Sequence, residues 1–236
     1  MKKIILSGIF LFSGFMMSAQ VSGTLGADIY SRTIDINQKN LAFGLSEAEF
    51  ELVKDQAYAN PEFVSGVIFQ DNKPIRAGVP MRYNAHADEI EIKSDPNASE
   101  VGSLVKDPNI FVKMGDQFYV LIPYKGSIER GSYFNVLHDG DNYSLYKKVT
   151  ATFKEGQPAQ STYSRDTPPS FQKETTYYLV EKDNFLELPS SRNRLQRVFT
   201  SGKKEMSDYI KNNKLDLRKE KDLAKAVEHF DSLHNK

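Results

Sequence analysis

Two short segments bring imidazole and carboxylate groups close enough in sequence to act together. The first, His86-Ala87-Asp88-Glu89, holds residue types that general acid–base catalysis uses. It lies where one predicted strand turns into the next, which favours a solvated turn. The sequence contains none of the G-x-S-x-G, H-E-x-x-H or G-x-x-x-x-G-K-[ST] motifs that supply a nucleophile, a metal site or a phosphate loop. We therefore predict no catalytic residue and no enzyme activity.

The second segment, His138-Asp139-Gly140-Asp141-Asn142, is the densest group of oxygen ligands in the chain. Calcium binds carboxylate and amide oxygens in flexible turns, but the calcium-loop pattern with its distal glutamate is absent. Asp, Asn and Gly are also the residues that a tight hairpin turn requires. His229 and His234 lie off the i, i+4 spacing of paired helical ligands. The sequence predicts a turn at 138–142, with no metal site and no cofactor.

Tyrosine is abundant enough in this chain to line a ligand site. The chain has 12 tyrosines, most of them in predicted strands. Tyrosine is favoured in strands because it packs well on a pleated surface, and it also lines ligand clefts and interfaces. We expect packing to account for most of them, and whether the aromatic sheet also lines a cavity stays open.

Composition excludes several classes of protein. The 236 residues are 39% apolar and 26% charged, which is typical of a globular domain and not of a disordered chain or a coiled coil. Lys plus Arg and Asp plus Glu each number 31, so no overall field favours nucleic acid. The absence of cysteine excludes disulfides and thiolate metal sites.

The first residues predict export. A basic Met1-Lys2-Lys3 precedes the apolar run Ile4–Met17, and Ser18-Ala19-Gln20 resembles a cleavage site. The run is shorter than the roughly 20 apolar residues that span a bilayer. We predict a signal peptide at 1–19, no transmembrane anchor, and a mature protein in the periplasm, at the cell surface or secreted.

The mature chain divides into three parts. Residues 20–60 predict a weakly ordered leader with one short helix, Ser46–Gln56, capped by Ser46 with Glu49. Residues 61–189 predict an antiparallel β domain, in which Glu89–Lys93 alternates strictly and so should place one face in water. Three hairpins follow, with strands expected at 110–113 and 117–122, 133–137 and 143–149, and 176–180 and 185–188.

Residues 190–236 predict three short helices. Ser190 or Ser191 should cap the first, with Gly202 at its end, and Asp216 should cap the last, which carries Leu223, Val227 and Phe230 on one face. The fold class is thus α+β: an antiparallel meander sheet of about eight strands, curled into a half-barrel or folded into a sandwich, with these helices packed on it. Residues 190–236 hold 12 basic and 7 acidic side chains, so a peripheral contact with an anionic surface is one interpretation and a solvated helix face is another.

Three strand sequences carry a resemblance to a known family. They are Phe63-Val64-Ser65-Gly66-Val67, Met81-Arg82-Tyr83-Asn84 and Asp88-Glu89-Ile90-Glu91-Ile92-Lys93. In this pattern the chain is similar to a family of exported proteins from Gram-negative bacteria for which no activity is established. The resemblance covers most of residues 60–233 and implies export, but no site residues.

These observations favour a non-enzymatic binding or structural protein of the cell envelope, with an envelope protein or a small ligand as partner and no nucleic acid. Two alternatives stay open: a hydrolase that acts on envelope material through an unrecognised carboxylate pair, and a scaffold component of an envelope complex. A cavity inside the sheet would favour a ligand, and a flat aromatic patch would favour a protein partner.

Overall fold

The computed structural model describes residues 29–34, 42–124, 127–159, 161, 164–182 and 184–234; the predicted signal peptide lies outside them. The strands are β1 (Tyr30–Ile34), β2 (Val64–Gln70), β3 (Lys73–Asn84), β4 (Glu89–Ile92), β5 (Val101–Leu104), β6 (Ile110–Met114), β7 (Gln117–Tyr124), β8 (Ser127–His138), β9 (Ser144–Lys154), β10 (Ser170–Glu181) and β11 (Asn184–Glu187). The helices are α2 (Glu47–Val53), the 3-10 helix η3 (Lys54–Ala57), α3 (Arg192–Val198), α4 (Lys203–Asn212) and α5 (Glu220–Ser232).

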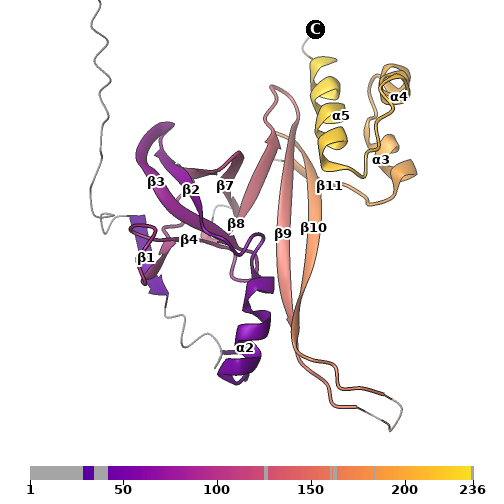
Figure 1. Cartoon of the computed structure of the whole chain (residues 1–236). Helices are drawn as coiled ribbons and strands as arrows, with labels where there is room; N and C mark the ends of the chain where they lie inside the picture. The colour runs from indigo at the N-terminus through magenta and orange to yellow at the C-terminus, as the bar shows by residue number, and fades with distance from the viewer. Residues whose placement is uncertain are drawn as a thin grey trace, which may run out of the picture.

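The described strands form one open antiparallel sheet in the order β1-β5-β4-β3-β2-β6-β7-β8-β9-β10-β11. The predicted α+β class and antiparallel sheet are confirmed, but eight strands was too few: the sheet has eleven among the described residues. All three predicted hairpins are present, as β6–β7, β8–β9 and β10–β11. The chain leaves the meander twice: β1 pairs with β5 and not with β2, and after β5 the chain crosses to β6, which pairs with β2. Figure 1 shows the sheet curling, with α2 near one end of β9 and β10 and the C-terminal helices near the other.

The sheet divides between β8 and β9. Along residues 144–154, β9 pairs with β10, and β8 pairs with β7 over most of its length. The two strands pair with each other only between residues 135–138 and 145–147. Beyond that point they diverge, which leaves a fork with unpaired backbone groups on either side.

The turn between β3 and β4 fills this fork. The amide of Ala151 in β9 donates to the carbonyl of Ala85 (3.1 Å), and the amide of Tyr133 in β8 donates to Asp88 Oδ1 (3.1 Å). His86 is exposed, as expected of a solvated turn, although its Nδ1 lies 2.9 Å from the Ala151 carbonyl. The prediction of a solvated turn is wrong for Asp88, because this carboxylate joins the two diverging strands.

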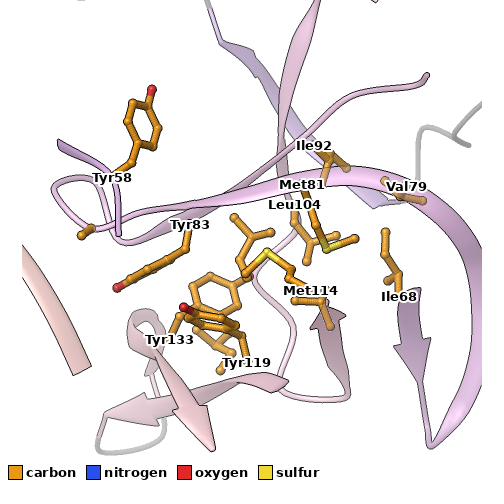
Figure 2. Packing of buried hydrophobic residues seen from close by; sticks show 14 of the residues in the cluster. Tyr58, Ile68, Val79, Met81, Tyr83, Ile92, Leu104, Met114, Tyr119 and Tyr133 are labelled. Atoms are coloured by element: carbon orange, nitrogen blue, oxygen red, sulfur yellow. The ribbon is translucent and has the colours of Figure 1, made fainter. Parts of the chain in front are cut away.

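Two hydrophobic cores lie in contact with the sheet. The sheet core contains, among others, Ile68, Met81, Tyr83, Ile90, Ile92, Leu104, Val112, Tyr119, Leu121 and Tyr133, with Val53 and Ala57 from α2 and η3. Figure 2 shows its tyrosines and methionines packed together inside the curl. The helix core joins β9 and β10 to the C-terminal helices through Leu145, Leu179, Leu188, Leu195, Phe199, Met206, Ile210, Leu215, Leu217, Leu223, Ala226, Val227 and Phe230. The prediction that Leu223, Val227 and Phe230 face the body of the protein is confirmed.

The helix ends agree with the sequence only in part. The capping box of Ser46 with Glu49 is present, and Ser191 is the N-cap of α3, without a side-chain bond. Gly202 does not end α3; it precedes α4 in the left-handed conformation, with φ 60°. The predicted cap by Asp216 is wrong, because Lys219 is the N-cap of α5. Asp216 instead accepts hydrogen bonds from Arg218.

The predicted turn at 138–142 attaches α5 to the sheet. The backbone amides of Asp141, Asn142 and Tyr143 all donate to the carboxylate of Asp231, at 3.2, 2.8 and 2.8 Å. A Cβ at Gly140 would collide with this carboxylate, so the close approach requires glycine. Burial alone raises the pKa of Asp231, but the amide bonds outweigh it and hold the pKa below its usual range.

Candidate functional site

One face of β9 serves both cores and defines the boundary between them. Its residues alternate, so Leu145, Lys147, Val149 and Ala151 share a face. Leu145 belongs to the helix core and Ala151 to the sheet core. Lys147 therefore lies where one core ends and the other begins.

A cleft of about 380 Å³ opens beside Lys147 and is lined mainly by residues of the sheet core. Its apolar and aromatic walls are Val64, Met81, Tyr83, Met114, Tyr119 and Val149. Asn60, Glu62, Arg82, Asp116, Gln117 and Lys147 supply the polar lining. Glu62 and Asp116 are exposed and form no ion pair with a described residue. The two cations of the lining are both paired, Arg82 with Glu91 and Lys147 with Glu220.

Arg82 is fixed by contacts on several sides. Its Nη2 lies 2.8 Å from Glu91 Oε2 and donates to the Tyr58 hydroxyl at 2.9 Å, while Nη1 donates to the Pro61 carbonyl at 2.9 Å. The guanidinium also lies 3.8 Å from the centre of the Tyr58 ring. With this many partners the side chain has little freedom to move, so this part of the wall is preformed.

Glu91 corrects a second prediction. The strict alternation of Glu89–Lys93 suggested that its acidic positions face water, yet Glu91 is 0% exposed. Asn84 Nδ2 donates to its Oε1 at 2.9 Å, and Arg82 neutralises its charge. A buried carboxylate is tolerated when it is paired and hydrogen-bonded in this way.

A second ion pair lies in the fork between β8 and β9. Lys148 Nζ lies 2.5 Å from Asp88 Oδ1, which also accepts from the Tyr83 hydroxyl at 2.7 Å. Burial alone raises the pKa of Asp88, but Lys148 and the hydrogen bonds outweigh it and hold the pKa below its usual range. Burial also lowers the pKa of Lys148, against the opposing effect of Asp88. The pair thus holds the hydroxyl group of Tyr83, whose side chain lines the cleft.

A row of polar side chains runs from the cleft to the helices. Tyr119, Asn135, Lys147 and Tyr177 occupy directly paired positions on β7, β8, β9 and β10. At the end of the row, Glu220 of α5 accepts from Lys147 Nζ (2.8 Å) and from the Tyr177 hydroxyl (3.1 Å). Asn135 Nδ2 donates to a carbonyl, whereas its buried Oδ1 has no hydrogen-bond partner among the described residues. Beyond Tyr177 lies a second hollow of about 620 Å³ between β10, α3 and α5.

The tyrosines of the cleft carry neutral hydroxyl groups at neutral pH. Burial raises the pKa of Tyr119 to about 12, and the nearby charge of Glu220 adds to the effect. Burial, and then Asp88, raise the pKa of Tyr83 further above its usual range. These groups are therefore hydrogen-bond donors and ring surfaces, not bases or nucleophiles.

A second aromatic group lies on the opposite face of the sheet. Phe134, Tyr146, Tyr178 and Phe185 come from four neighbouring strands, β8 to β11, and their rings contact one another at centroid distances of 5.4–6.2 Å. Tyr146 and Tyr178 are paired and adjoin Leu145 and Leu179, which face the helices. Because neighbouring residues in a strand point to opposite faces, this aromatic group faces away from α3–α5. All four rings are half-buried.

The remaining residues singled out in the sequence have structural contacts. His229 stacks on Tyr209 at 3.7 Å between ring centres, and His234 Nδ1 lies 2.8 Å from the Phe230 carbonyl. Within the described ranges no three histidine, aspartate or glutamate side chains are grouped so that they could hold a metal ion. The described helices also include none with the length and apolar character needed to cross a bilayer.

Neither protein-family models, nor curated proteins, nor solved structures gave a match to this chain.

Proposed function

We propose that this protein is an exported, non-enzymatic binding protein of the cell envelope that holds a small ligand in the cleft beside Lys147, at the sheet core. The observation that carries the proposal is the cleft itself. Its volume of about 380 Å³ falls within the range of roughly 300–1,000 Å³ that is typical of small-molecule sites. Its walls combine apolar and aromatic surface with a few fixed polar groups, which is the usual chemistry of such sites.

The two ion-paired carboxylates behind the cleft wall, Asp88 and Glu91, are unsuited to hydrolysis, and the two in its lining, Glu62 and Asp116, are exposed to solvent. A carboxylate pair that cleaves bonds needs one member with a raised pKa, so that it is protonated and can act as an acid. Asp88 has a lowered pKa and is held by Lys148. Glu91 is buried under Arg82, away from solvent. Both carboxylates therefore act as fixed anchors for the cleft wall.

The lining indicates the kind of ligand. Met81 and Met114 give adaptable apolar contacts, and the rings of Tyr83 and Tyr119 give flat ones. Because Arg82 and Lys147 are already neutralised, the lining has no unpaired cation among its described side chains that would attract an acid. A neutral or amine-bearing ligand with an apolar body suits this surface better than a carboxylic acid.

Calorimetry with three probes of equal chain length tests the proposal: 1-octanol, octylammonium and octanoate. We expect the alcohol and the ammonium to bind and octanoate to bind more weakly. Val64→Trp, which adds a large ring at the lining, should abolish binding. Leu52→Trp places the same ring on an exposed part of α2 and is the matched control, because Leu52 is 81% exposed. Absence of binding by all three probes, or equal binding by the two Trp variants, would refute the cleft as the site.

The scaffold alternative is favoured by a separate observation, the aromatic group Phe134, Tyr146, Tyr178 and Phe185. A flat aromatic surface on a sheet suits a protein partner. We place it second because those rings are half-buried against one another and form a surface without a cavity.

A further inference from the structure

Four of the seven acidic side chains in residues 190–236 accept hydrogen bonds from described groups: Asp216, Glu220, Asp222 and Asp231. Glu220 accepts from Lys147 and Tyr177, and Asp231 accepts from the turn at 141–143. Asp216 is held by Arg218, whose hydrogen bonds lower the pKa of Asp216 to about 2. Glu220 and Asp231 are thus engaged by the sheet and its turn, whereas Glu205, Asp208 and Glu228 stay exposed on the helices.

Four of the exposed cations line a groove between α3 and α4. Two hollows of about 410 and 470 Å³ share Gln196, Ser207 and Ile210 in their linings, so they adjoin one another. Their basic lining residues are Arg197, Lys203, Lys211 and Lys214. In α4, Lys203, Ser207 and Lys211 follow one another at intervals of four residues, which places them along one side of the helix.

These four cations lack an internal counter-charge. No described carboxylate forms an ion pair with any of them, and the one acid in the lining, Asp216, is occupied by Arg218. Cations that share a groove repel one another, so an anion bound among them relieves this repulsion. Arginine and lysine together are suited to a phosphate group, arginine through paired donors and lysine as a point charge.

The floor of the groove is apolar. Met206 and Ile210 from α4 and Leu215 after it are buried at the base of the cationic rim. A free phosphate would use only the rim. A ligand that combines a phosphate with an adjoining hydrocarbon chain would use both the rim and the floor.

We propose that the groove formed by Arg197, Lys203, Met206, Ile210, Lys211, Lys214 and Leu215 binds the headgroup of an anionic phospholipid. It would attach this end of the protein to a bilayer surface. In Figure 1 and in the contacts between elements, α5 lies nearest β8 and β9, with α4 on its far side. The four basic residues of the groove are exposed. The inference does not depend on the cleft beside Lys147, which shares no lining residue with the groove.

Vesicle flotation tests the proposal. The full mature chain should float with vesicles of phosphatidylcholine and phosphatidylglycerol but not with phosphatidylcholine alone. The triple variant Lys203→Gln, Lys211→Gln, Lys214→Gln should lose affinity by about a hundredfold, given that each lysine near an anionic surface contributes of the order of a fivefold change. The control triple variant Lys219→Gln, Lys221→Gln, Lys225→Gln removes the same charge from exposed positions outside the groove and should bind nearly as well as the wild type.

Three outcomes would overturn the inference. Equal losses in the two triple variants would show that net charge alone is responsible. Displacement from the vesicles by glycerol phosphate at the concentration of the lipid headgroups would show that a soluble phosphate compound is the ligand. No flotation with the anionic vesicles would exclude a lipid site. Melting temperatures of both variants, measured alongside, should match that of the wild type because all six lysines are exposed.

Discussion

Replacing Asp231 tests the attachment of α5 to the sheet. Its carboxylate accepts three backbone hydrogen bonds from the β8–β9 turn. Hydrogen bonds to charged groups contribute about 1.5–3 kcal/mol each. The three share one carboxylate, and the exposed turn would regain water, so we expect Asp231→Ala to lower the free energy of unfolding by about 2–4 kcal/mol. Asp231→Asn keeps an oxygen for Asn142 and Tyr143 but turns an amide nitrogen towards Asp141, and should cost about 1–2 kcal/mol.

The stability that Asp231 contributes should decrease at acidic pH. The pKa of Asp231 is lowered in the folded state, so the stability that it contributes is complete above its unfolded pKa of about 3.9. That contribution is lost as the pH falls through the lower, folded pKa. The difference in unfolding free energy between wild type and Asp231→Asn should therefore be constant near neutrality and narrow below about pH 4. Contributions from the other carboxylates cancel in this difference.

Denaturant unfolding followed by circular dichroism is the assay, with Glu228→Gln as the control on the same helix. Glu228 is exposed, so its replacement should change the free energy of unfolding by about 0.5 kcal/mol or less. If Asp231→Asn is as stable as Glu228→Gln, or if the difference from wild type does not change on acidification, the amide–carboxylate contact does not hold α5 in place.

Four further predictions follow from the packing and the sequence. Phe230→Ala should cost about 3–5 kcal/mol in urea unfolding because the ring is 1% exposed, whereas Lys225→Gln on the exposed side should cost about 0.5 kcal/mol or less; similar values for both would mean that α5 is not docked. Glu91→Ala should cost about 3–5 kcal/mol in the same assay, because it leaves Arg82 without its buried partner; an unchanged transition midpoint would contradict this. Mass spectrometry of the exported protein should find an N-terminus near Gln20, and an intact Met1 would contradict export. A chelator should leave the melting temperature unchanged, and a clear decrease would indicate a structural metal ion.

The sequence predicted local structure well, because local rules determine it. The three hairpins and the Ser46 capping box rest on turn and cap residues whose partners lie a few positions away. Strand β5 was missed, since Gly102 and Ser103 have low strand propensity, and it is the pairing with β1 and β4 that makes it a strand.

The candidate site was beyond sequence reasoning because its contacts are distant in the chain. Asp88 and Lys148 are 60 residues apart, and no short sequence motif extends over that distance. Glu91 was predicted to face solvent, yet it is 0% exposed. The alternation of polar and apolar residues indicates on which face of a strand a residue lies, but not whether other residues cover that face. One feature of the sequence could have indicated the Arg82–Glu91 ion pair. The two residues lie nine positions apart in two successive predicted strands, a separation at which a hairpin places residues opposite each other.

The turn that fills the fork between β8 and β9 has a consequence for the order of folding. During synthesis, residues 85–88 are made well before β8 and β9, the strands that they contact. The β3–β4 turn therefore lacks these partners until β8 and β9 have been made. Joining the fork requires contacts between residues 45 to 66 positions apart, which are slow to form because a long loop must first be closed. Filling of the fork should therefore be a late step in folding, because it requires the chain from β3 through β9. A chain that ends before β9 cannot form these contacts, so its β3–β4 turn would stay exposed.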